Sequence, residues 1–443
     1  MTDPQSDLLD KIRQQFDSSP YPRIPLDKSP KNDPNELYIH NLVTSFYLRD
    51  QKVIDTKGRV ILDAGCGSGY KSLILAEANP GAKIVGVDIS AESIKLAQQR
   101  LEHHGFDNVE FLATSIEELP SLGCQFDYIN CDELLYLFPE PAIALKSMQS
   151  VLKPDGIIRS NLHSSIQRAN FFRAQKMFRM MGLLDENPED LEVEIVVETM
   201  QALKDNVLLK AQTWDTKYTV QENKQDILMN HLFQGDKGYT ISDLFDALRL
   251  SDLEFISMVN WREWDFRDLF KEGDNLPVFL GMSLPDLSIE DRLQMYELIH
   301  PIHRLLDFWC GHPQQAQSFV PFSEWSGFDW QTAKIYLHPQ LNTSNFREDL
   351  ITNVTGCGIL SLNKYLSTHK QVVTLDSSMA TCLLPLLDAP QSMLSLVERW
   401  KQFRPVDPVT LQPIDHEKAF QLVQNTVKSL ESLDYLMLEL QSH

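Results

Sequence analysis

Short apolar runs alternate with helical stretches through the first half of this chain. The apolar runs cover residues 59–64, 83–88, 109–113, 126–131 and 156–162, and amphipathic helices are predicted between them, notably at 91–103 and 140–152. Regular alternation of this kind predicts a parallel sheet with helices on both faces, a doubly wound α/β fold. Two later apolar runs, LEFISMV at 253–259 and PVFLGMSL at 277–284, are predicted to add strands and give seven in total.

The flanking sequence predicts additional parts. Residues 1–57 combine an amphipathic helix with a proline-rich stretch and are expected to form a lid arm. Residues 58–284 form the α/β domain, with a helical insert at 163–250. Residues 285–443 are expected to form a mainly helical domain, in which residues 382–400 read as a helix-turn-helix or winged-helix element.

The charge and cysteine content of the chain disfavour several classes of binding partner. The chain has 62 Asp plus Glu against 40 Lys plus Arg, a formal net charge of -22. This charge disfavours nucleic acid and anionic lipid as partners. The sequence has no signal-peptide pattern and no apolar run long enough to span a membrane, and its six cysteines form no CxxC pair. A cytoplasmic protein with reduced thiols and no metal is expected.

The stretch VILDAGCGSG at 60–69 is the most informative segment. A strand ends there in three alternate glycines, Gly65, Gly67 and Gly69, and a helical pattern follows. A dinucleotide fingerprint would need a third glycine where Tyr70 stands, which weakens an NAD interpretation. Asp88 ends the next strand, where a carboxylate can accept hydrogen bonds from both hydroxyls of a ribose.

With these residues in view, the chain resembles the class I S-adenosylmethionine-dependent methyltransferases. VILDAGCGSG is similar to their first motif, IVGVDIS at 84–90 to the second, FDYINCDELLYL at 126–137 to the fourth, and VLKPDGII at 151–158 to the turn before the fifth strand. The resemblance implies S-adenosylmethionine as cofactor, with its amino-acid end at the glycines, its ribose at Asp88 and its adenine against Ile89.

The third motif departs from the family pattern. Ser115 stands where many members carry an aspartate that bonds the adenine, so adenine selection is expected to depend on Ile116 and backbone groups. The residues implied to hold the cofactor are Asp63, Gly65, Gly67, Gly69, Asp88, Ile89, Ser115, Ile116 and Cys131.

Three residues near strand ends are candidates for acceptor chemistry. Asp132 and Tyr136 follow the fourth strand and His163 follows the fifth, and ligands bind at this edge of doubly wound sheets. A carboxylate suits an amine acceptor, whereas a histidine suits a hydroxyl. Each residue also has a structural interpretation, as a helix cap, a core tyrosine or a loop histidine.

Two other groups of residues are considered as possible functional sites. HPIHRLLDFWCGH at 300–312 fits no standard zinc spacing, and His303 and Asp307 are expected to form a surface pair on a helix. The helix at 164–181 carries Arg168, Arg173, Lys176 and Arg179. These cations are expected to pair with the acidic run at 185–198; the alternative is a docking face for an acidic partner.

The sequence therefore predicts a methyltransferase that acts on an oxygen or nitrogen atom of a small metabolite or natural product. Two alternatives stay open: a peptide or protein methyltransferase that uses residues 285–443 for recognition, and a non-catalytic cofactor-binding regulator. Acceptor identity and oligomeric state are not predicted.

Overall fold

The computed structural model describes residues 21–215, 217–218, 220–315, 320–367, 372–407 and 409–440. The chain divides into two compact units. The first contains residues 21–26 with Val60–Ser72 and Ile84–Pro313, and the second contains Asp27–Arg59, Leu73–Lys83 and the described residues from Gln314 onward. The helix predicted within residues 1–17 lies outside the described residues.

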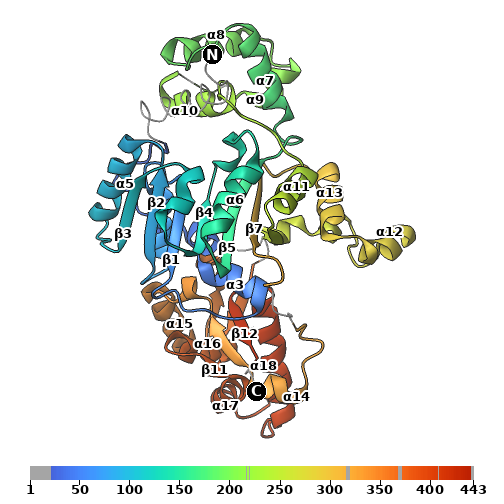
Figure 1. The fold of residues 1–443 in the computed structure, drawn as a ribbon. Coiled ribbons are helices and arrows are strands. Elements are labelled where there is room, and N and C mark those ends of the chain that lie inside the picture. Colours follow the sequence, from blue (N-terminus) through green and yellow to red (C-terminus); the bar gives the residue numbers. More distant parts are fainter. Residues whose placement is uncertain are drawn as a thin grey trace. The chain divides into compact units, whose positions relative to one another are not determined.

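A seven-stranded sheet organises the described part of the first unit (Figure 1). Its strand order is β3-β2-β1-β4-β5-β7-β6. The bounds are β1 Val60–Ala64, β2 Lys83–Asp88, β3 Val109–Ala113, β4 Phe126–Cys131, β5 Leu152–His163, β6 Glu254–Met258 and β7 Leu305–Gly311. The predicted doubly wound, mostly parallel fold is confirmed, because β1 to β5 run parallel and only β7 runs antiparallel to its neighbours, β5 and β6.

Strand β7 was not predicted. It pairs antiparallel with β5, with His163 opposite Leu305 and Ile158 opposite Cys310. The predicted strand at 277–284 is wrong, because this segment forms helix α12 (Val278–Ser283). The domain boundary expected at 284/285 is also wrong for the sheet, which continues to Gly311.

Helices cover the faces of the sheet. Between the strands lie α4 (Tyr70–Ala78), α5 (Ala91–His103), the 3-10 helix η2 (Ile116–Leu122) and α6 (Pro141–Val151); α11 (Ile241–Leu250) precedes β6, and α13 (Ile289–Ile299) precedes β7. Ser90 caps α5 by accepting the amide of Ser93, and Thr240 caps α11 by accepting that of Asp243.

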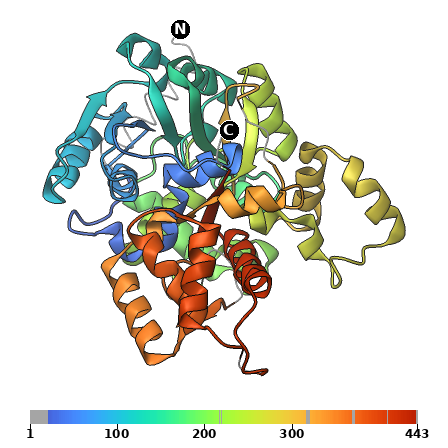
Figure 2. The same cartoon turned by 90° about the horizontal axis from the view of Figure 1, so that it is seen from below.

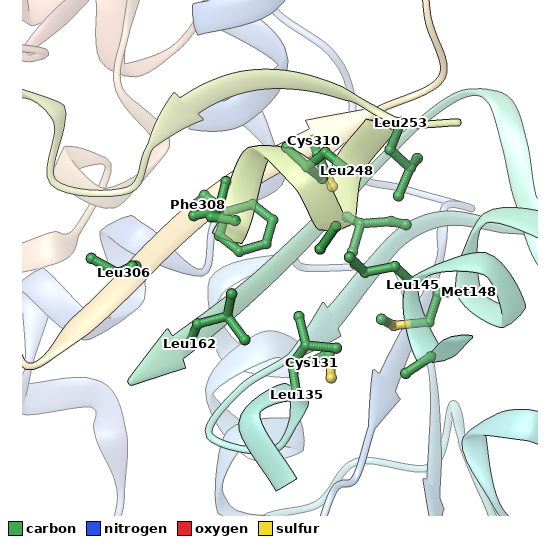
Figure 3. Packing of buried hydrophobic residues seen from close by; sticks show 14 of the residues in the cluster. Cys131, Leu135, Leu145, Met148, Leu162, Leu248, Leu253, Leu306, Phe308 and Cys310 are labelled. Atoms are coloured by element: carbon green, nitrogen blue, oxygen red, sulfur yellow. The ribbon is translucent and has the colours of Figure 1, made fainter. Parts of the chain in front are cut away.

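The main apolar core lies between the sheet and helices α6 and α11 (Figure 3). Leu145 and Met148 of α6, Leu248 of α11 and Phe308 and Cys310 of β7 belong to this core, and all five are essentially buried. Burial of apolar side chains on this scale stabilises the sheet by about 1.5–3 kcal/mol for each large residue. Strand β7 is therefore an integral part of this core.

The insert between β5 and α11 is helical, as predicted. It contains α7 (Ala169–Met180), α8 (Asp190–Ala202), α9 (Leu208–Thr213) and α10 (Val220–Asn230). These helices form a small core of their own around Phe178, Val193 and Trp214. The insert begins six residues after His163, so it is anchored directly at the carboxyl edge of the sheet.

The second unit is less helical than predicted. Its helices are α2 (Pro34–Ile39), α3 (Leu42–Asp50), α14 (Gly327–Thr332), α15 (Ser344–Gly356), α16 (Ser377–Leu383), α17 (Met393–Phe403) and α18 (His416–Glu431). A three-stranded sheet, β11-β8-β12, joins Gln391–Ser392, Lys334–Leu337 and Leu436–Glu439, and a separate pair joins β9 (Ile359–Ser361) with β10 (Thr374–Asp376). Its C-terminal helices, orange to red, can be followed in Figure 2.

The helix pair predicted within residues 382–400 corresponds to the end of α16 and most of α17. A 3-10 helix (Leu384–Leu387) and strand β11 separate the two.

Candidate active site

The glycine turn joins β1 to α4. Gly65, Gly67 and Gly69 have positive φ angles of 80°, 50° and 80°. An ideal Cβ on Gly67 would lie 2.2 Å from the backbone oxygen of Tyr21, so a side chain there would collide with main chain. Position 67 therefore requires glycine for two reasons, its left-handed backbone and this close approach.

Asp63 lies beneath the turn. Its carboxylate is buried and accepts hydrogen bonds from Ser72 Oγ at 2.6 Å and Asn130 Nδ2 at 2.9 Å. Burial raises the pKa of Asp63 to about 6, although both hydrogen bonds act in the opposite direction. These contacts make Asp63 a support for the glycine turn.

Asp88 ends β2 as predicted and faces the same turn. Its two carboxylate oxygens accept the backbone amides of Gly67 at 3.0 Å and Ser90 at 2.9 Å. The next residue, Ile89, has 37% of its surface exposed. A fixed carboxylate beside an exposed apolar side chain provides the two kinds of contact that a ribose and a flat base require.

Residues 21–26 are held against the glycine turn. Tyr21 accepts the amide of Ser68 at 2.8 Å through its backbone oxygen, and Pro22 accepts Ser68 Oγ at the same distance. Fully buried Arg100 of α5 donates to the carbonyls of Ser68, Ile24 and Pro25 at 2.7–2.9 Å. This segment, part of the predicted lid arm, is therefore fixed by hydrogen bonds to the turn and to α5.

Asp132 follows β4 and is engaged by cations. Lys71 Nζ lies 3.0 Å from its Oδ2, and Arg159 Nη2 lies 3.9 Å from its Oδ1. Asn161 also donates to Oδ1 at 2.5 Å. Only 5% of the side chain is exposed. The carboxylate belongs to a buried network that holds β4 and β5 together.

His163 ends β5 and is oriented by Asp236. Its Nδ1 lies 2.6 Å from Asp236 Oδ1, and Arg304 Nη1 donates to Nε2 at 3.1 Å. Because the carboxylate can only accept and the guanidinium can only donate, the proton is on Nδ1 and Nε2 is the acceptor. Burial lowers the pKa of His163, despite the opposing effect of Asp236. His163 is thus a neutral imidazole with an unprotonated Nε2.

The neighbours of His163 are themselves held by further contacts. The ring of Tyr136 stacks on the imidazole, with centroids 3.7 Å apart, and its hydroxyl donates to Glu133 Oε2 at 3.1 Å. Glu133 forms an ion pair with Arg304 through both of its oxygens. The buried carboxylate of Asp236 accepts in turn from Arg168 at 2.8 Å and Gln175 at 2.9 Å.

A cavity of about 420 Å³ opens beside these groups. Its lining residues come from residues 21–24, the ends of β4 and β5, helix α10 and the start of β7. They are Tyr21, Pro22, Arg23, Ile24, Glu133, Tyr136, His163, Glu222, Gln225, Asp226, Met229, Asn230 and Arg304. Two of the three predicted acceptor residues, Tyr136 and His163, therefore line one cavity, and Asp132 does not.

The remaining predicted cofactor residues differ in their surroundings. Ser115 begins η2, where its amide donates to Glu118 Oε2 at 3.4 Å. The side chains of Ile116 and Cys131 are buried in the main core, so only their backbones can approach a ligand. Burial raises the pKa of Cys131 to about 12, which keeps it a neutral thiol.

Sequence reasoning missed Asp236, Arg304 and Arg100. Asp236 and Arg304 lie 73 and 141 residues from His163 in the chain and come from loops without a recognisable motif. Glu133 lies within the fourth motif but was not among the candidate residues. One signal could have indicated Arg100: it stands on the apolar face of the amphipathic helix α5, where a charged residue is unusual.

The pairing predicted for His303 and Asp307 is wrong. His303 stacks on Trp264 with centroids 4.4 Å apart, whereas Asp307 accepts from Arg159 at 2.7 Å. Residue 307 lies in a strand, so helical i,i+4 spacing does not apply. Phe308 and Trp309 are buried, as predicted. In the described part of the chain, no three His, Cys, Asp or Glu side chains gather in a way that could hold a metal ion.

Known proteins resemble this chain at several levels. Residues 55–233 match the family model for a methyltransferase domain. An uncharacterized protein of Synechococcus is 26% identical over 71% of this chain and 73% of its own length. The ubiquinone biosynthesis O-methyltransferase of Actinobacillus pleuropneumoniae is 32% identical over 28% of this chain, which spans only 56% of that relative.

Solved structures share the fold over a longer range. PKMT2 from Rickettsia typhi aligns with 94% of this chain and 76% of its own, with a TM-score of 0.57 and 17% identity. Its complex with AdoHcy aligns with 90% of this chain, with a TM-score of 0.56 and 16% identity. None of the described helices has the length and apolar character that a membrane crossing requires.

The glycine turn, the aspartate after β2, the strand order and the family match agree with one another. Residues 55–233 therefore form a methyltransferase domain, its sheet has the class I strand order, and S-adenosylmethionine is its cofactor.

Proposed function

We propose that this protein transfers the methyl group of S-adenosylmethionine to a hydroxyl oxygen of a small acceptor, with His163 as general base. The observation that carries this proposal is the neutral His163, oriented by Asp236, which lines a cavity together with Tyr21 and Pro22, and these two residues also contact the glycine turn. A positioned base of this kind typically accelerates proton transfer by about 10²–10⁴-fold.

The residues of the turn fit the cofactor. Asp88 would bind the ribose hydroxyls, Ile89 the adenine, and the backbone of Gly65 and Gly67 the amino-acid end; Asp63 would support the turn from below. When bound, the cofactor supplies an electrophilic methyl group on a sulfonium. If Asp88 has this role, Asp88→Ala should weaken binding of S-adenosylhomocysteine in calorimetry, and unchanged affinity would exclude it.

The proton of the acceptor hydroxyl would be taken up by His163. The hydroxyl replaces Arg304 as the group facing Nε2 of His163, and Nε2 takes its proton as the oxygen attacks. The imidazolium that forms keeps the proton on Nδ1, which stays hydrogen-bonded to Asp236. The negative charge of Asp236 stabilises the imidazolium. Glu133 holds Arg304 beside the cavity while the hydroxyl occupies Nε2.

The named relatives support an oxygen acceptor. The relative from Actinobacillus is an O-methyltransferase by name, although the match covers little more than half of it. The cavity volume of about 420 Å³ lies within the range of small-molecule sites, about 300–1,000 Å³.

An amine acceptor, including one on a peptide, is the second candidate. Glu222 and Asp226 of α10 line the cavity together with Glu133 and would attract a cation. The fold likeness to PKMT2 extends through the second unit and is compatible with this alternative.

Incubation with methyl-labelled S-adenosylmethionine and fractionated cell lysate tests the proposal. We expect label in the small-molecule fraction as a methyl ether, and its loss with His163→Gln. Label found as methylated amine, and retained with His163→Gln, would contradict an oxygen acceptor. If the cofactor binds but no fraction accepts label, the chain is a cofactor-binding regulator.

A further inference from the structure

Helix α7 presents cations in a strongly acidic protein. Arg173, Lys176 and Arg179 are exposed and lie three residues apart, so they follow one face of the helix. The predicted pairing with the acidic run at 185–198 is wrong for these three. Within the described ranges none of them forms an ion pair, and Arg173 donates only to Asn170.

Two acids of α8 have other partners. Asp190 pairs with Lys224, and Glu192 accepts the amide of Glu189 at 2.8 Å in a capping box. Within the described residues no ion pair neutralises Arg173, Lys176 or Arg179, although the chain has a net charge of -22.

A hollow of about 570 Å³ lies beside the last two of these cations. Phe172 and Met180 contribute apolar surface, and the Met180 side chain has 82% of its surface exposed. The full lining is Phe172, Gln175, Lys176, Arg179, Met180, Asp236 and Gly238. The hollow shares no lining residue with the cavity at His163.

Asp236 does not give the hollow a negative surface. Its side chain has no exposed area, and its carboxylate is paired with Arg168 and hydrogen-bonded by Gln175. The exposed charges of the hollow are thus Lys176 and Arg179 alone, a local charge of about +2 next to apolar surface.

We propose that this hollow is a second binding site, for a small organic anion with an apolar body. A carboxylate, sulfate or phosphate would lie between Lys176 and Arg179, and the body would pack on Phe172 and Met180. Charge complementarity selects the anion, because the rest of the protein surface repels it. The bound ligand would lie behind Asp236, on the side away from His163.

Octyl phosphate is a suitable probe for the full-length protein, with 1-octanol as the neutral match. We expect saturable binding of octyl phosphate in calorimetry, at least about tenfold weaker binding of 1-octanol, and weakening as salt is raised. In protein labelled with ¹³C-methyl methionine, the Met180 signal, assigned with Met180→Leu, should shift on binding.

The double variant Lys176→Gln/Arg179→Gln should bind octyl phosphate at least about tenfold more weakly. Arg173→Gln is the control, since it removes one positive charge from the same helix outside the hollow, and should change affinity less than about twofold. Equal affinity of the double variant and the control, equal binding of 1-octanol, or an unmoved Met180 signal would each overturn the site. Thermal unfolding of all variants shows whether they are folded.

Discussion

The ends of β4 and β5 offer two polar groups in equivalent positions with opposite surroundings. Asp132 and His163 both follow parallel strands at the same edge of the sheet, and both are buried. Asp132 is surrounded by Lys71, Arg159 and Asn161, which stabilise it as a fixed anion. His163 has the Asp236 carboxylate at Nδ1 and the Arg304 guanidinium at Nε2, and it lines a cavity. A position at a strand end makes a residue a candidate for catalysis. Its charged neighbours determine whether it can accept a proton.

His163→Gln should have the largest effect on catalysis. Glutamine keeps a polar group near the ring position but cannot take a proton at neutral pH. We expect kcat to fall by about 10²–10⁴-fold with unchanged affinity for S-adenosylhomocysteine. A fall below about threefold would remove His163 from the proton-transfer step.

Asp236→Asn should have the next largest effect, about ten- to a hundredfold on kcat. Asp236 raises the pKa of His163 against the effect of burial, so its loss lowers that pKa further. Activity requires neutral His163 and therefore falls as pH drops through its pKa. The acid limb of kcat/KM should lie below the ordinary histidine value in the wild type and at still lower pH in Asp236→Asn. An unmoved acid limb in the variant would show that Asp236 does not act through His163.

Asp132→Asn should affect stability more than chemistry. The substitution removes the buried carboxylate that pairs with Lys71 and Arg159. We expect the free energy of unfolding to fall by about 1–3 kcal/mol. Below the unfolding transition we expect kcat to fall by less than about threefold. Denaturant titration and steady-state kinetics on the same preparation separate the two effects. If kcat fell as far as in His163→Gln, Asp132 would be the better candidate for the base.

Arg304→Gln should have the smallest effect. The positive charge of Arg304 lowers the pKa of His163, so its removal should raise that pKa. The acid limb of the pH profile then moves to higher pH, while the rate at pH 8 changes by less than about threefold. A large loss at pH 8 would mean that Arg304 contacts the acceptor directly.

The sequence predicted the parallel half of the sheet closely. The three strands at 83–88, 109–113 and 126–131 have the predicted bounds, because each is a short apolar run between clear breaks. The run PVFLGMSL was misassigned because an apolar stretch of eight residues does not distinguish a strand from a helix. In α12 the side chains of Val278, Phe279 and Met282 are exposed, whereas Leu280 packs against the core.

The site could be predicted only in part. Asp88, Tyr136 and His163 follow strands, and strand ends can be located in a sequence. Asp236 and Arg304 come from loops, and only the folded chain brings them to His163. Nothing in the sequence indicated that Arg159, in the middle of an apolar strand, would pair with Asp307 and Asp132 and so remove Asp132 from the cavity.

The place of β7 in the sheet has a consequence for the order of synthesis. In the described part of the first unit β6 pairs only with β7, and β7 also completes the edge of β5. A growing chain that has reached Met258 therefore has two strands with open edges until residues 305–311 leave the ribosome. Open edges favour pairing between chains. Release of a chain shortened before Leu305 should consequently produce aggregation, even though the whole cofactor turn has been made.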